Sequence, residues 1–172
     1  MPNPWTLAAL VLAAVGTAIA VAALIVGIVA LGGDSDTDAP TKAAPRAYTV
    51  WLVEQALARY ERDGAEATLD YYNSPEALDG PWYVFVIEDR DGALYSVANS
   101  NRPDLVGTTY ERIDANGYDY GAAFAETADG GAGQWVTYLF THPVTRQNAP
   151  KHTWIVRRGE FLFGAGWYEG IN

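Results

Sequence analysis

Two contrasting patterns of hydrophobic and polar positions divide the chain. Residues 5–31 are almost entirely Ala, Val, Leu and Ile, and no charged side chain occurs before Asp34. This run is longer than the roughly 20 apolar residues that a helix needs to cross a bilayer. It predicts a membrane anchor within residues 1–33, although the small residues at 30 and 32 leave open its cleavage as a signal peptide.

Residues 34–46 are small and polar, with two prolines, and predict a flexible linker. From residue 47 a folded domain is expected to extend to residue 172. Val50, Val53 and Leu57 recur at spacings of three and four, which predicts an amphipathic helix that ends at Asp63 and Gly64. A short second helix is expected at 65–72.

The remaining pattern is one of short β-branched and aromatic runs separated by turn residues. It predicts five strands, at 82–88, 94–99, 134–141, 152–158 and 160–168, with a short helix at 121–128. Asp91 and Gly92 are typical of a hairpin turn between the first two strands. A long helix packed on a five-stranded antiparallel sheet, an α+β fold, follows from this order.

Charge and composition exclude several functions. The chain has 11 Lys and Arg against 21 Asp and Glu, a net charge of −10, which disfavours nucleic acid as a partner. It has no cysteine, so it can form no disulfide and offers no thiolate for catalysis or zinc binding. Because no P-loop, nucleophile elbow or His-Glu-x-x-His motif occurs, we expect no catalysis and no cofactor.

Several short motifs occur in an order that resembles one known family, the single-Cache sensor domains. They are GPWYVFV at 80–86, DG at 91–92, LVG at 105–107, DANG at 114–117, GQWVTY at 133–138, KHTW at 151–154 and FGAGWY at 163–168. The resemblance covers roughly residues 48–169. It implies a PAS-like fold, with a sheet and a long N-terminal helix.

The resemblance also implies a function. Such domains usually lie outside the cytoplasmic membrane and bind small solutes, often short carboxylates such as acetate, propionate, lactate or pyruvate. They usually serve chemoreceptors, histidine kinases or cyclases. No second apolar run follows Tyr168 in this sequence, so we expect a partner protein to read the bound state. Dimerisation through the long helix is also implied, although its apolar stripe can equally pack on the sheet.

A carboxylate in a partly buried pocket requires a cation, and two residues are candidates. Lys151 is the only lysine of the predicted domain and stands where the resemblance places a lysine, at the start of the fourth strand. A solvated lysine at a strand end is the structural alternative. Arg102, in the irregular segment after the second strand, is the second candidate.

Aromatic residues are the expected walls of the pocket. Tyr83 and Phe85 share one face of the first strand, and Tyr138 lies on one face of the third. Trp135 and Trp154 are further candidates, but on a regular strand Trp154 faces away from Lys151, so only a bulge could bring both to one site. Core packing is the alternative for every one of these rings.

Asp114, Asn116 and Asp119 resemble part of a calcium loop, but the acidic residue expected at the twelfth position is replaced by Ala125. We therefore expect no metal. The leading hypothesis is a membrane-anchored, extracytoplasmic module that binds a small solute in a sensory role, and the alternative is a protein-interaction module of the cell envelope that binds no ligand.

Overall fold

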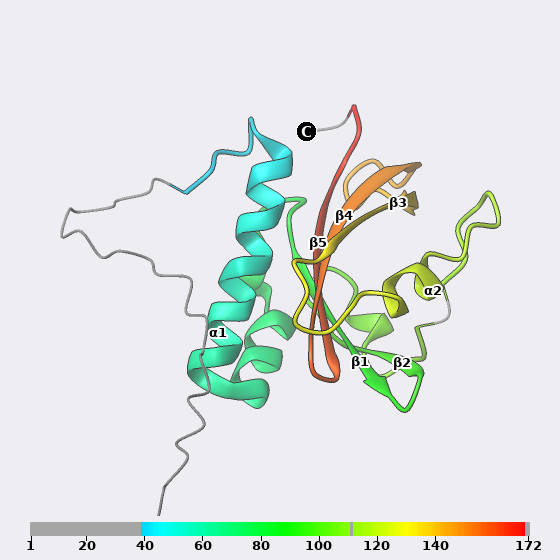
Figure 1. The fold of residues 1–172 in the computed structure, drawn as a ribbon. Coiled ribbons are helices and arrows are strands. Elements are labelled where there is room, and N and C mark those ends of the chain that lie inside the picture. Colours follow the sequence, from blue (N-terminus) through cyan, green and yellow to red (C-terminus); the bar gives the residue numbers. More distant parts are fainter. Residues whose placement is uncertain (1–38, 111, 171–172) are drawn as a thin grey trace, which may run out of the picture. The chain divides into compact units, whose positions relative to one another are not determined.

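The computed structural model describes residues 39–110 and 112–170, which belong to the second of two units of the chain, Thr37–Asn172. Five strands form one antiparallel sheet in the order β2-β1-β5-β4-β3. Figure 1 shows the long helix α1 on one face of this sheet and the short helix α2 on the other. The elements are α1 (Pro45–Asn73), β1 (Val84–Arg90), β2 (Ala93–Asn99), α2 (Tyr120–Ala125), β3 (Gln134–Thr141), β4 (Asn148–Arg158) and β5 (Phe161–Tyr168), with 3-10 turns η1 (Pro75–Ala77) and η2 (Pro103–Leu105).

Helix α1 consists of two helical segments, before and after Gly64, because Gly64 adopts a non-helical conformation, with φ of 82° and ψ of 176°. A residue with a β-carbon rarely adopts this φ, so the glycine sets the break. The first segment buries Val53, Ala56 and Leu57 against the sheet. The predicted end of the first helix at Asp63 and Gly64, and the short second helix, are confirmed.

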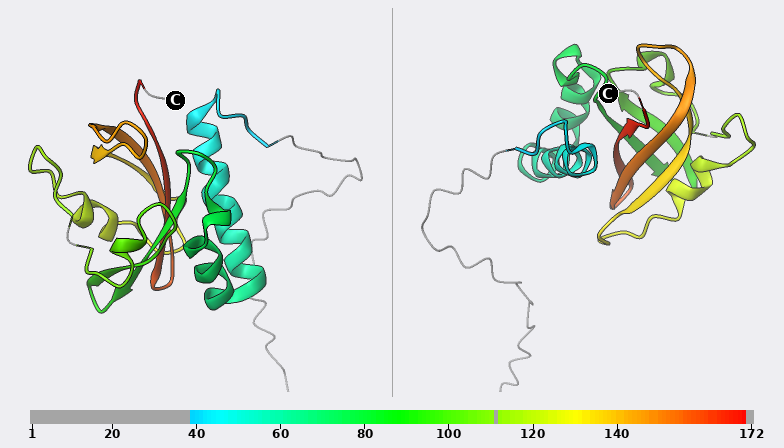
Figure 2. Two further views of the ribbon diagram at one scale, coloured as in Figure 1. Left: turned by 180° about the vertical axis from the view of Figure 1, so that it is seen from behind. Right: turned by 90° about the horizontal axis from the view of Figure 1, so that it is seen from above.

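The centre of the sheet is buried on both faces. Val84 and Val86 of β1 belong to the core beneath α1, whereas Phe85 and Ile87 belong to a second core on the opposite face. The two views of Figure 2 show α1 alone against one side of the sheet and the α2 region on the other. Alternate residues of β1 therefore serve two separate cores.

The predicted α+β fold with a long N-terminal helix and five antiparallel strands is confirmed. One boundary differs clearly, because β4 begins at Asn148 rather than at residue 152. The longer strand includes Pro150, although proline cannot donate to a ladder. It is tolerated because the pairing of β4 with β5 begins only at Lys151 and Tyr168.

The apolar run at 5–31, predicted to be a membrane anchor, lies outside the described residues. Among the described helices, none is both long enough and apolar enough to cross a bilayer.

Candidate functional site

Lys151 lies in the middle of an aromatic cluster on the face of the sheet that looks away from α1. Only 1% of its surface is exposed. Its Nζ donates a hydrogen bond of 2.8 Å to the hydroxyl of Tyr83. The same nitrogen lies 4.4–5.6 Å from the centroids of four rings, those of Tyr83, Phe85, Phe140 and Tyr168. Ring faces attract a cation, so the cluster is built to hold an ammonium group.

Glycines of β5 make the room for this arrangement. A β-carbon at Gly166 would stand 2.9 Å from Cε of Lys151 and 2.6 Å from the carbonyl oxygen of His152. A β-carbon at Gly164 would stand 2.3 Å from the ring of Phe85. The two glycines of the sequence GAG, Gly164 and Gly166, therefore leave room for the side chains of Phe85 and Lys151.

Tyrosine hydroxyls supply the neutral polar groups of the site. The Tyr138 hydroxyl lies 3.0 Å from Oγ1 of Thr153, and Tyr168 donates to the carbonyl oxygen of Thr141 over 3.2 Å. Burial, followed by electrostatic interactions with Tyr110 and Tyr83, raises the pKa of Tyr138 well above its ordinary value. Burial, followed by the effect of Tyr83, also raises the pKa of Tyr168. Both remain protonated at neutral pH and can donate hydrogen bonds.

Within the described part of the chain, no ion pair involves Lys151. An ammonium group has three donor hydrogens, and among residues 39–110 and 112–170 Lys151 uses one of them, toward the Tyr83 hydroxyl. A buried charge without an opposite partner is expensive, whereas pairing it with an anion recovers much of that cost. The cluster therefore favours a small anionic ligand.

Helix α2 covers this face of the sheet. Its Tyr120 ring stacks on the Tyr138 ring at 4.0 Å, and its Phe124 ring lies 5.9 Å from that of Phe85. The C-terminal end of α2 is fastened to the sheet by Arg157, which donates to the carbonyl oxygens of Ala125 and Thr127. A ligand that reaches Lys151 has to displace part of this aromatic cover.

The structure brings four of the seven predicted site residues together, namely Tyr83, Phe85, Tyr138 and Lys151. The pairing of β3 with β4 is regular, so Trp135 faces Trp154 on the α1 side, and no bulge brings them to Lys151. The expected parity conflict is real, and both tryptophans lie in another cluster with Trp167 and the Arg46 guanidinium. They are not neighbours of Lys151.

Arg102 is already paired with a carboxylate. Its Nε and Nη2 donate to the two oxygens of Asp104 over 2.8 and 2.6 Å. The hydrogen bonds that Arg102 donates to Asp104 raise the pKa of Arg102, and burial opposes this. The charge of Asp104 and, to a smaller extent, electrostatic interactions with Tyr83 and Tyr120 also raise it. Arg102 therefore lies near the tyrosines of the site, but its charge is matched, unlike that of Lys151.

Phe140 shares a strand face with Tyr138, as strand parity predicts, and its ring also lies beside Lys151. The sequence did not single out three other residues of the site, which are Thr153, Tyr168 and Tyr120. Parity offered a signal for Thr153, which shares a strand face with Lys151. Tyr168 is the cross-strand partner of Lys151, and that pairing required the register of β4 and β5.

The loop at Asp114 is a turn held by hydrogen bonds. Its carboxylate accepts from the backbone N–H groups of Asn116, Tyr118 and Leu139 over 2.8–3.0 Å. These bonds, that of Leu139 first, lower the pKa of Asp114. The described residues contain no group of three or more His, Asp or Glu side chains arranged to hold a metal ion.

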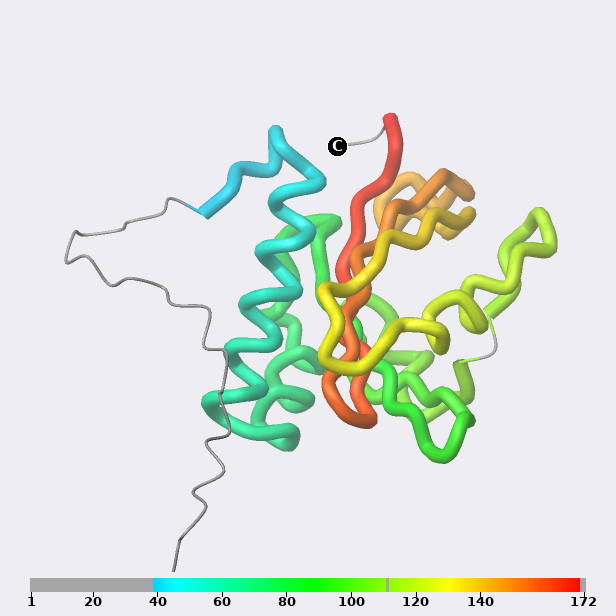
Figure 3. The backbone as a smooth tube through the Cα atoms, viewed as in Figure 1, coloured from blue at the N-terminus to red at the C-terminus, as the bar shows by residue number. Residues whose placement is uncertain are grey.

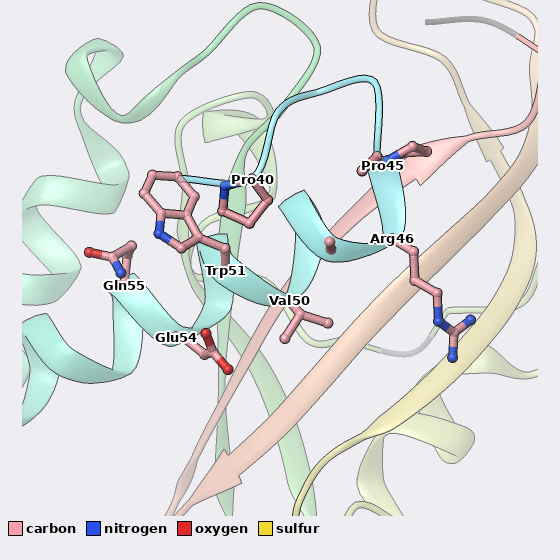
Figure 4. Close-up of a pocket in the computed structure, with 9 residues that line it drawn as sticks. Pro40, Pro45, Arg46, Val50, Trp51, Glu54 and Gln55 are labelled. Atoms are coloured by element: carbon pink, nitrogen blue, oxygen red, sulfur yellow. The ribbon is translucent and has the colours of Figure 1, made fainter. Parts of the chain in front are cut away.

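A separate open groove of about 970 Å³ lies at the N-terminal end of α1. Figure 4 shows Trp51 beside Pro40, and Val50, Glu54 and Arg46 along the helix. The groove is formed by α1 and the segment before it, whereas Lys151 belongs to the opposite face of the sheet.

Comparison with known proteins identifies the fold. No protein-family model matches the chain, and neither does any curated protein. A methyl-accepting chemotaxis protein of Vibrio parahaemolyticus matches with a TM-score of 0.58 and 18% identity over 75% of this chain and 88% of that one. The periplasmic sensor domain of a chemotaxis protein matches with a TM-score of 0.53 and 24% identity over 69% and 85%.

A third solved structure is described as a Cache chemosensory domain that recognises carboxylic acids. It matches with a TM-score of 0.52 and 12% identity over 69% of this chain and 84% of that one. At these identities the likeness concerns the fold. The described residues therefore have the single Cache-type fold of sensor domains, as the ordered motifs predicted.

Proposed function

We propose that this chain is a membrane-anchored, extracytoplasmic sensory module that binds a short carboxylate at Lys151. The ligand carboxylate would pair with the Lys151 ammonium and accept hydrogen bonds from the hydroxyls of Tyr83 and Tyr138. Phe85 and Phe140 would enclose its apolar part. The observation that carries this proposal is a fully buried lysine for which the described residues provide no carboxylate partner.

The similar structures support the proposal without extending it to a particular ligand. One of them is a periplasmic sensor domain and another recognises carboxylic acids. The apolar run at residues 5–31 would anchor the chain, with the described domain outside the membrane. A partner protein would read the bound state, and the chain itself could form a homodimer.

The test is a thermal-shift screen of the full chain in detergent micelles against acetate, propionate, lactate, pyruvate, amino acids, amines and urea. A ligand that binds only the folded state raises the midpoint. We expect a shift of several degrees with one class of carboxylate, and none in Lys151→Met. The matched control is Lys42→Met, which removes the only other lysine, on the surface, and should keep the shift.

A second function is favoured by the dense aromatic packing around α2. Tyr110, Tyr120, Phe124 and Tyr138 contact one another face to face or edge to face, with centroids 4.0–6.4 Å apart. Such packing suits an interaction module of the cell envelope that binds no small molecule. No thermal shift with any compound, in a well-folded protein, would overturn the sensory proposal and favour this one.

A further inference from the structure

The four-residue turn Asp79–Trp82 lies between the Lys151 site and the N-terminal end of α1. Asp79 and Trp82 exchange backbone hydrogen bonds of 3.0 and 3.2 Å. Gly80, inside the turn, has a φ of 64°, which favours glycine. The turn is thus tight, and a displacement at its Trp82 end is expected to reach Asp79.

One end of this turn belongs to the candidate site. Tyr83 follows Trp82 directly, is buried, and accepts the hydrogen bond from Nζ of Lys151. Trp82 and Tyr83 point in opposite directions from the chain, as neighbours in an extended segment do. Tyr83 therefore reaches the ligand side, while Trp82 reaches α1.

The other end of the turn holds the start of α1 and the segment before it. The Asp79 carboxylate accepts hydrogen bonds of 2.5 Å from the Tyr48 hydroxyl and from Nζ of Lys42. The Tyr48 ring also meets the Trp82 ring edge to face at 4.9 Å. Figure 3 shows the chain rising beside the upper half of α1 before it enters β1, which places the turn there.

We propose that this turn transmits the state of the Lys151 site to the segment that precedes α1. The inference rests on the proposed function for the nature of the ligand. A carboxylate that pairs with the Lys151 ammonium replaces the bond from Lys151 to Tyr83 with one that Tyr83 donates to the ligand, and the resulting movement of Tyr83 shifts Trp82. The ion pair between Asp79 and Lys42 then changes. In the sequence, Lys42 lies between the N-terminal apolar run and α1. The output is therefore directed toward the N-terminal side of the domain.

The absence of cysteine allows a direct test. A single cysteine at the exposed Ala43, next to Lys42, would carry a spin label on the full chain in detergent micelles. We expect propionate, acetate, lactate or pyruvate to change the mobility of the label. In Tyr48→Phe and Lys42→Met the thermal shift should remain while the mobility change is lost. Persistence of the mobility change in both variants would overturn the proposal.

A second experiment needs no ligand and therefore separates this proposal from the proposed function. Tyr83→Phe and Tyr48→Phe are combined in a double-mutant cycle for unfolding by urea. We expect the double variant to depart from additivity by more than about threefold in the unfolding constant, as for coupled residues. The control cycle pairs Tyr48→Phe with Thr153→Val, whose hydroxyl lies beside that of Tyr138 on the Lys151 face, and should be additive within about twofold.

The outcomes of the two experiments are distinguishable. An additive Tyr83–Tyr48 cycle overturns the coupling even if a carboxylate binds. A non-additive cycle, with no thermal shift for any carboxylate, supports the mechanical link while the proposed ligand fails.

Discussion

At the scale of the residue, the clearest expectation about the free energy of unfolding concerns Lys151. Removing its charge should stabilise the ligand-free protein, because a buried ion that lacks an opposite charge is unfavourable. We expect Lys151→Met, which keeps most of the side-chain volume, to raise the free energy of unfolding by about 1–3 kcal/mol. Urea unfolding of the full chain measures this, with Lys42→Met as the surface control. A loss of more than about 2 kcal/mol would instead indicate a structural lysine.

His142 provides a residue-scale prediction about pH. It is 2% exposed, its Nδ1 accepts from the N–H groups of Val144 and Thr145, and its ring meets Tyr168 at 4.6 Å. Burial lowers the pKa of His142. The unfolded chain therefore takes up a proton near pH 6.5 that the folded chain resists, and stability falls as the pH decreases below about 6.5.

Substitution of His142 by asparagine keeps an acceptor near the same place and removes the titration. The thermal midpoint of His142→Asn should therefore change less between pH 7 and pH 5 than that of the unaltered chain. Parallel pH profiles of the two proteins would contradict this account of the His142 side chain.

At the scale of the element, β5 contributes the ring of Tyr168 to the site, and its glycines contribute space. Gly166→Ala would bring a β-carbon within 2.9 Å of Cε of Lys151, so the lysine must move. We expect a loss of about 1–3 kcal/mol in stability and a several-fold weaker affinity for the carboxylate found in the screen. Ala165→Gly alters the neighbouring residue on the α1 face, and should reduce stability without changing affinity. If Gly166→Ala and Ala165→Gly bound the carboxylate with equal affinity, Gly166 would have no role in forming the binding site.

The helices and strands were largely predictable from the sequence, whereas the contacts between side chains of different strands were not. The spacing of Val50, Val53 and Leu57 and the break at Gly64 are local signals, so α1 could be predicted from its own residues. Lys151 is predicted at the start of the fourth strand but lies inside it, because β4 begins at Asn148. Its cross-strand partner Tyr168 could not be predicted, because the register of β4 and β5 depends on contacts between distant parts of the sequence.

The two tryptophan candidates show the same limit. Trp135 and Trp154 stand at motif positions, but their faces depend on whether β4 contains a bulge. The regular register, with Lys151 opposite Tyr138 and Trp154 opposite Trp135, places the two pairs on opposite faces of the sheet. A bulge is a local irregularity that periodicity does not reveal.

At the scale of the whole molecule, the net charge of −10 opposes the approach of a carboxylate. Long-range repulsion between surface charges and the ligand is screened by salt, whereas a buried pair at Lys151 is screened much less. We therefore expect carboxylate affinity to stay constant or rise modestly as ionic strength increases from about 10 to 150 mM. Calorimetry in the two buffers measures it. Affinity that falls steeply with salt would point to an exposed cation instead of Lys151.

The location of the domain relative to the membrane can be tested on the whole molecule because the chain has no cysteine. Val144 is 71% exposed in the connection between β3 and β4, so Val144→Cys should react with a membrane-impermeant maleimide in intact cells. Ala149→Cys, at a buried position in β4, is the matched control and should stay unlabelled while the domain is folded.

Labelling of Val144→Cys in intact cells is the expected result, since the proposed module meets its carboxylate outside the membrane. Labelling that appears only after the membrane is permeabilised would place the domain inside. The Lys151 site would then have to bind a cytoplasmic anion, and the sensory proposal would lose its extracytoplasmic setting while the chemistry of the site remained.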